Sequence, residues 1–220
     1  MSDKRKTFYL NSDKEKPVTA GGVIIYRFVA ENVELLLADT RGNFEDLGGR
    51  ADQKDDDIVN TVAREAYEES NKILSKKEIM KRLNEVQPIY IEKTKYALFI
   101  IPALEKEVRL VGSDFGDREI HDDIERTIKW IPLAVFLLPE IIKNKLNWRL
   151  KSKQVFDRLK ALKPGSNTRI TIDVFKTPSS KSTSTISTIY VSSTSNDEDS
   201  ESEDSESMKP KKVSKTKTKN

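Results

Sequence analysis

The sequence predicts an α/β fold in which helices cover both faces of a mixed β-sheet. Short runs rich in β-branched and aromatic residues, typical of strands, recur through the first two thirds of the chain. A charged segment between two of these runs repeats its apolar residues at helical spacing, and amphipathic helices follow the last run. Elements of both kinds can bury their apolar faces together when helices pack outside a sheet, which predicts a helix–sheet–helix sandwich.

Six strands are expected in the sheet. A polar turn at Glu31–Asn32 separates the first two, and we expect these two to pair as a hairpin. The third leads into a glycine pair, and the fourth and fifth are expected to be antiparallel neighbours. The predicted strands cover residues 18–28, 33–38, 43–47, 88–93, 96–102 and 128–133.

Four helical regions are expected around the sheet. The first begins after Asp55, Asp56 and Asp57, one of which can cap its free N–H groups, and ends near Asn71, which tolerates a left-handed backbone. Its apolar stripe consists of Ile58, Val59, Val62, Ala63 and Ala66. The other predicted helices cover residues 75–86, a short stretch from about 133 that Pro139 interrupts or restarts, and residues 148–162.

Composition limits the class of protein. The chain has 220 residues, of which 34% are charged and 36% hydrophobic, which favours one domain with appendages. It has no cysteine, which excludes disulfides and a thiolate metal site. The polar N-terminus lacks the apolar run of a secretory signal, and no stretch approaches the length of a membrane span. We therefore expect an intracellular protein, cytoplasmic or nuclear, with no membrane partner.

The C-terminal part changes character at Pro164–Gly165. The apolar run in residues 170–175 predicts an added strand, after which serine and threonine dominate, followed by an acidic block and a lysine-rich end. Such a segment cannot bury enough apolar surface to offset its chain entropy, so we expect it to be disordered. The predicted organisation is a polar segment at 1–16, a folded domain at 17–163, an extra strand at 164–176 and a tail at 177–220.

An acidic cluster on the first helix points to chemistry. Glu65, Glu68 and Glu69 share one face of the helix, where like charges repel by about 0.2–0.5 kcal/mol per pair. A hard divalent cation such as Mg²⁺ or Mn²⁺ relieves that repulsion, because carboxylate oxygens are its preferred ligands. The same cluster alone is also typical of an ordinary solvated helix face, so its context decides between the two interpretations.

That context resembles the signature of the Nudix hydrolases. The family pattern opens with a glycine, matched here by Gly49, and its core Arg-Glu-aliphatic-x-Glu-Glu is matched without a gap by residues 64–69. The strand at residues 20–25 and the segment 128–133 also resemble parts of Nudix domains. The chain departs from the pattern by one extra residue after Gly49, by Asp56 in place of the first glutamate, and by Asn71 and Lys72 in place of a glycine and an aliphatic residue.

The resemblance implies a metal-dependent pyrophosphohydrolase that uses Mg²⁺ or Mn²⁺. Glu65 and Glu69, with Glu68, would be the metal ligands, Arg64 would orient their carboxylates, and the carbonyl of Gly48 would add a ligand. Family members take their base either from these glutamates or from a later loop. Additional candidates in this chain are Glu119 and Glu125 as the late acid, and Arg50 as a contact to the substrate phosphates.

Several alternatives stay open at this point. The single histidine, His121, is a candidate base or stacking residue, although a lone histidine in a charged loop is more often simply solvated. The substrate would be a nucleoside diphosphate linked to another group, including nucleotides, polyphosphates and capped RNA. The basic helical region at 143–163 and the tail could contact nucleic acid. A catalytically inactive binding module and an RNA-binding protein are the alternative functions.

Overall fold

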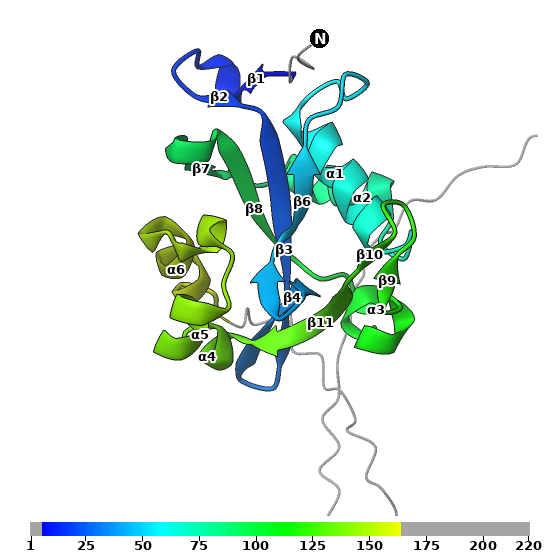
Figure 1. Cartoon of the computed structure of the whole chain (residues 1–220). Coiled ribbons are helices and arrows are strands. Elements are labelled where there is room, and N and C mark those ends of the chain that lie inside the picture. Colours follow the sequence, from blue (N-terminus) through cyan, green and yellow to red (C-terminus); the bar gives the residue numbers. More distant parts are fainter. Residues whose placement is uncertain (1–5, 164–220) are drawn as a thin grey trace, which may run out of the picture. The chain divides into compact units, whose positions relative to one another are not determined.

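The structure, a computed structural model, describes residues 6–163, which form a seven-stranded mixed sheet with helices on both faces (Figure 1). The main path of the sheet runs in the order β11 (Thr127–Pro132), β4 (Asn32–Thr40), β3 (Ala20–Val29), β8 (Tyr96–Pro102) and β7 (Ile89–Ile91). The pairing of β3 with β8 is parallel and the other pairings are antiparallel. The predicted sandwich around a mixed sheet is confirmed.

One edge of the long central strand β3 carries two partners. Its first half pairs with β6 (Leu47–Arg50), in which Gly48 is opposite Gly22, and its second half pairs with β4. β5 (Asn43–Glu45) pairs with β4, so the predicted strand 43–47 is divided between two strands at Asp46. After β4 and β5 the chain crosses to the first half of β3, where β6 pairs. The glycine pair of β6 therefore lies beside the first residues of β3.

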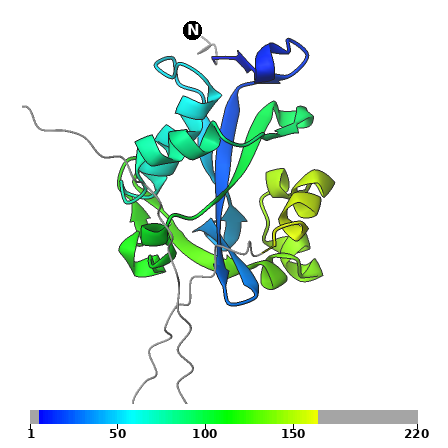
Figure 2. The same ribbon diagram turned by 180° about the vertical axis from the view of Figure 1, so that it is seen from behind.

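Helices on the two sides of the sheet close two separate cores. α1 (Ile58–Glu69) and α2 (Lys76–Leu83) cover one face, and α4 (Leu133–Phe136), α5 (Pro139–Asn144) and α6 (Lys153–Lys160) cover the other, as both views show (Figures 1 and 2). Alternate residues of β4 go to opposite cores: Leu36 and Ala38 pack toward α1, while Leu35 and Leu37 pack toward the C-terminal helices. Because both faces of the sheet are covered, the sequences of its central strands are nearly continuous apolar runs.

Smaller elements complete the described region. β1 (Phe8–Tyr9) pairs with β2 (Pro17–Val18), and β9 (Arg118–Glu119) pairs with β10 (Ile124–Glu125). The short helices are η1 (Leu10–Ser12), η2 (Glu92–Thr94), α3 (Glu105–Val108), η3 (Gly112–Asp114) and η4 (Trp148–Lys151). Within residues 6–163, no helix is long and apolar enough to cross a lipid bilayer.

The expected helix at 148–162 is wrong in one respect. It is divided into η4 and α6 because Ser152 has extended backbone angles, φ −82° and ψ 145°. The Ser152 side chain instead accepts a hydrogen bond from the N–H of Val155 and caps α6, a position that serine favours over a helix interior. The predicted restart at Pro139 is confirmed, because Pro139 opens α5. The predicted strand at 170–175 and the tail at 177–220 lie outside the described residues.

Candidate functional site

The glycine pair of β6 lies directly against the acidic face of α1. The N–H of Gly48 donates a hydrogen bond to Glu69 Oε2 at 3.0 Å. A Cβ atom at Gly49 would lie 2.4 Å from both Cδ and Oε2 of Glu65, so any residue other than glycine at this position would displace the Glu65 carboxylate. The structure therefore brings Gly48, Gly49, Glu65 and Glu69 together, as the order of these residues in the sequence predicts.

Arg64 holds the carboxylates around it. Its Nε and Nη2 atoms donate to the two oxygens of Asp55, each at 3.0 Å, and its Nη1 atom lies 2.9 Å from both Glu65 Oε1 and Glu68 Oε2. Nη2 also donates to the carbonyl of Arg50. One guanidinium thus fixes two helix glutamates and ties the helix to the loop that precedes it.

In the loop before α1, the carboxylate that Arg64 contacts is Asp55 and not Asp56, the residue that the sequence matched to the first acidic position of the family pattern. Asp55 is buried and also accepts hydrogen bonds from the Thr61 hydroxyl and the Asp52 N–H, whereas Asp56 is exposed. Asp57 caps α1 by accepting from the N–H of Asn60, as one of the three aspartates was expected to do.

Arg126, immediately after β10, is a site residue that the sequence did not indicate. Its Nη1 atom lies 2.5 Å from Glu69 Oε1 and 2.9 Å from Glu119 Oε2, so it joins the end of α1 to the β9–β10 hairpin. Glu119 is 4% exposed, while Glu125 on the paired strand is exposed to solvent. Of the two candidate late acids, only Glu119 reaches the cluster.

Burial and mutual repulsion set the protonation of these acids. Burial raises the pKa of Glu65 to about 6, against the stabilising effect of Arg64 on its charged form. Burial, and to a smaller extent Glu65 and Glu119, hold the pKa of Glu69 well above its usual range despite the nearby Arg126. The pKa of Glu119 is also raised by burial. Ionisation of these carboxyl groups is therefore unfavourable in the absence of a nearby cation.

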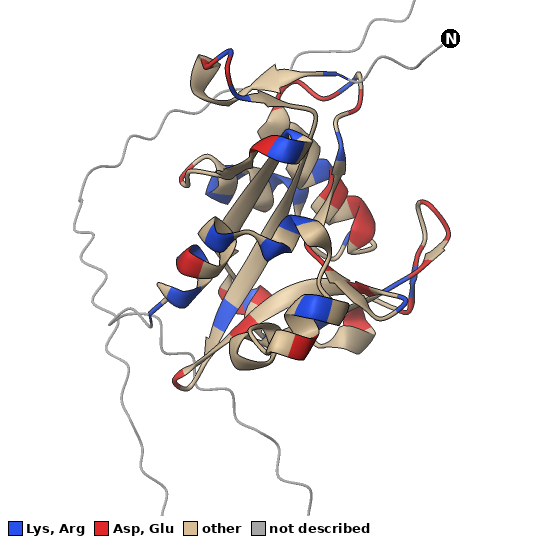
Figure 3. Cartoon of the chain, turned by 60° about the vertical axis from the view of Figure 1, so that its left-hand side comes forward, with Lys and Arg blue, Asp and Glu red and all other residues tan. Residues whose placement is uncertain are grey.

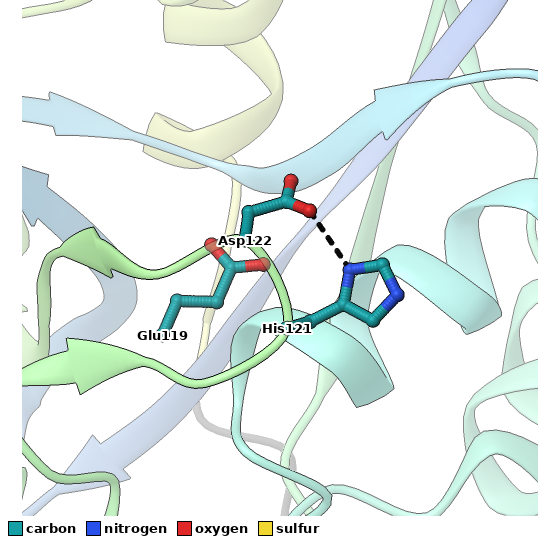
Figure 4. A group of neighbouring side chains, drawn as sticks. All are labelled: Glu119, His121 and Asp122. Atoms are coloured by element: carbon teal, nitrogen blue, oxygen red, sulfur yellow. Dashed lines mark hydrogen bonds and ion pairs between the residues drawn. The ribbon is translucent and has the colours of Figure 1, made fainter.

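A second group of possible metal ligands lies at the hairpin. Among the described residues, the only set of three or more histidine or acidic side chains with ligand atoms all within 4.8 Å of one another is Glu119, His121 and Asp122 (Figure 4). His121 Nδ1 lies 2.9 Å from Asp122 Oδ1, and its Nε2 lies 3.9 Å from Glu68 Oε1. His121 is thus exposed but borders the acidic face of α1. Figure 3 shows acidic residues on both α1 and this hairpin.

The opposite face of the glycine pair is supported by a buried polar network. The Tyr96 hydroxyl donates to Asp46 Oδ2 at 2.5 Å, and Arg149 Nη2 lies 3.3 Å from Asp46 Oδ1. Arg149 also stacks over the Tyr96 ring, at 4.8 Å from its centroid. Arg149, one of the cations in the basic region at 143–163, is therefore directed into the fold and not toward solvent.

Comparison with known proteins gives limited similarity. No family model matches the chain, and no curated protein matches it. Among solved structures, a C. elegans Ap4A hydrolase in a binary complex aligns with a TM-score of 0.39 and 18% identity, over 66% of this chain and 96% of that chain. Shewanella oneidensis NrtR in complex with a 27mer DNA aligns with a TM-score of 0.33 and 17% identity, over 64% of this chain and 61% of that chain. Neither match assigns an activity to this chain.

Proposed function

We propose that the chain is a metal-dependent hydrolase of phosphoanhydride bonds, built on a Nudix-type domain. The observation that carries the proposal is the contact of Glu65 and Glu69 with the glycine pair of β6. The glutamates of a solvated acidic helix face would make no such contact and would be exposed to water. Glu69, in contrast, is only 7% exposed. The order of glycine pair, acidic loop and helix, together with this packing, favours a metal site over an ordinary solvated helix face.

The donor atoms around the glycine pair fit Mg²⁺ or Mn²⁺. Glu65 and Glu69 are the proposed ligands, with Glu68 beside them on the same face of α1. The carbonyl of Gly48 faces the same edge of β6 as its N–H, which is bonded to Glu69, because both groups of a strand residue point to one side. Divalent ions held there would neutralise the charge of a pyrophosphate and make water a better nucleophile.

The remaining side chains orient the site and handle protons. Arg64 fixes the positions of Glu65 and Glu68 through charge-assisted contacts at 2.9 Å. Glu119 is the proposed late acid, because it is buried beside Glu69 while Glu125 is exposed. Burial raises the pKa of Glu119, which makes its ionised form a stronger proton acceptor than an exposed carboxylate. Arg50, exposed at the end of β6, is the proposed contact for substrate phosphates.

The proposed substrate is a nucleoside diphosphate linked to another group: a nucleotide, a polyphosphate or capped RNA. RNA binding as the main function is a second candidate, favoured by one observation. In the C-terminal helical region, Trp148 is 55% exposed, the Lys153 side chain is 87% exposed, and Lys151 and Lys160 are also exposed. Exposed cations and exposed aromatic residues are the side chains with which proteins contact single-stranded nucleic acid.

A substrate panel tests the proposed function. The purified chain is incubated with dinucleoside polyphosphates, nucleoside triphosphates, nucleotide sugars, diphosphoinositol phosphates and capped RNA, with Mg²⁺, Mn²⁺ or a chelator. The expected result is metal-dependent turnover of at least one phosphoanhydride, absent from a Glu69→Gln sample purified in parallel. No turnover of any compound by the wild type would reject the proposal, and salt-sensitive RNA binding retained in the variant would support the second candidate.

Gly49→Ala is expected to lower kcat/KM roughly 10²-fold, because small displacements of positioned groups have effects of that size. The new methyl group would occupy the place of the Glu65 carboxylate, which must then swing away. Since the end of a flexible side chain moves easily, we expect the melting temperature of the metal-free protein to change little. Steady-state kinetics and thermal unfolding of the same preparation check this. Wild-type kcat/KM in Gly49→Ala would show that the position of Glu65 is unimportant.

A further inference from the structure

Asn71, two residues beyond α1, connects the end of that helix to the hairpin of β9 and β10. Its side-chain Nδ2 donates to the carbonyls of Phe115 and Arg118, at 2.7 and 2.8 Å, and its Oδ1 accepts from the N–H of Ile120 at 2.9 Å. Both donor hydrogens and the acceptor of the amide are thus used on the backbone of one segment.

The hairpin depends on such external support. β9 and β10 have two residues each, pair within residues 6–163 only with one another, and form a sheet separate from the main one. A two-stranded hairpin of this kind is at best marginally stable alone. Yet it carries Glu119, which is buried and is joined to Glu69 through Arg126. The position of Glu119 therefore depends on what holds the hairpin to α1.

We propose that Asn71 is a positioning residue that fixes the β9–β10 hairpin and thereby places Glu119 beside Glu69. The consequence for catalysis rests on the proposed hydrolase function, whereas the structural link does not. Asparagine fits both demands of the position: a left-handed backbone, φ 53°, and an amide with two donors and an acceptor. Glycine would meet only the first demand, and aspartate would direct an acceptor at the carbonyls of Phe115 and Arg118.

Hydrogen exchange tests the structural link in the full chain. In Asn71→Gly, peptides covering 115–126 are expected to exchange roughly tenfold faster or more, because a locally opened segment loses its protection. Asn71→Asp is expected to do the same. The matched control is Asn11→Gly in η1, where Asn11 has the same φ of 53° and, among the described residues, makes an exposed side-chain contact to Gln87. It should leave residues 115–126 unchanged. Unchanged exchange in Asn71→Gly would overturn the proposal.

Kinetics test whether the link acts through Glu119. In Asn71→Gly we expect kcat to fall about tenfold while KM changes by less than about twofold, since a misplaced group affects the reacting state most. In the Glu119→Gln background, Asn71→Gly should cause no further loss of kcat, because the effects of residues that act as a unit do not add. Additive losses would overturn the role of Asn71 in placing Glu119. If the wild type hydrolyses nothing, the proposed function fails, and hydrogen exchange still decides whether Asn71 holds the hairpin.

Discussion

Glu69→Gln is expected to reduce kcat by about 10²–10³-fold, the loss typical when one preorganised electrostatic contact to a reacting centre is removed. Glutamine keeps the size of the side chain and an oxygen that can accept the Gly48 N–H, so the strand contact survives. What it removes is the negative charge, which the proposed metal site requires. Steady-state kinetics with Mg²⁺ and Mn²⁺ measure the loss.

Metal-induced stabilisation separates a lost ligand from a damaged fold. At a free Mn²⁺ concentration a hundred times Kd, binding to the folded state raises the free energy of unfolding by about 2.7 kcal/mol. We expect this gain in the wild type and in the control Glu140→Gln, an exposed glutamate on α5, but little of it in Glu69→Gln. Equal stabilisation of all three proteins by Mn²⁺ would contradict the assignment of Glu69 as a ligand.

Most of the fold could be predicted because its signals are local. Runs such as those in β3, β4 and β8 are apolar on both faces, and turn residues at their ends mark the boundaries. The division of 148–162 was missed because the apolar spacing on either side of Ser152 agrees with a single helix. Only the capping preference of serine argued for a break, and in the structure Ser152 caps α6 through the N–H of Val155.

The site was predictable where its residues are neighbours in sequence. The glycine pair and residues 64–69 are brought together by one strand–loop–helix unit, so the motif contains most of the geometry. Choosing between Asp55 and Asp56 required knowing which carboxylate is buried, and spacing alone does not report burial. Arg126 and the side-chain contacts of Asn71 join segments that are far apart in the chain. No local periodicity encodes such contacts.

The largest stability effect is expected at a buried ion pair remote from the glycine pair. Arg82 on α2 donates from Nη1 and Nη2 to the two oxygens of Glu107 on α3, at 2.8 and 2.7 Å, and the two residues are 7% and 2% exposed. Arg82→Met is expected to lower the free energy of unfolding by about 3–5 kcal/mol, because it leaves a buried carboxylate without its partner. That is a large share of the roughly 5–15 kcal/mol typical of a folded domain.

Two comparisons distinguish the buried charge from the loss of any ion pair. Arg109→Met removes an exposed pair with Glu105, whose side chains are 76% and 77% exposed, and should cost no more than about 1 kcal/mol. The double variant Arg82→Met/Glu107→Leu removes both buried charges and should be more stable than Arg82→Met. Its recovery is expected to be partial, because Pro102 loses a donor to its carbonyl and Leu104 loses the acceptor of its N–H. Urea unfolding in the presence of a chelator measures all three variants. Equal midpoints for Arg82→Met and Arg109→Met would show that solvent reaches the pair and that its burial contributes nothing to stability.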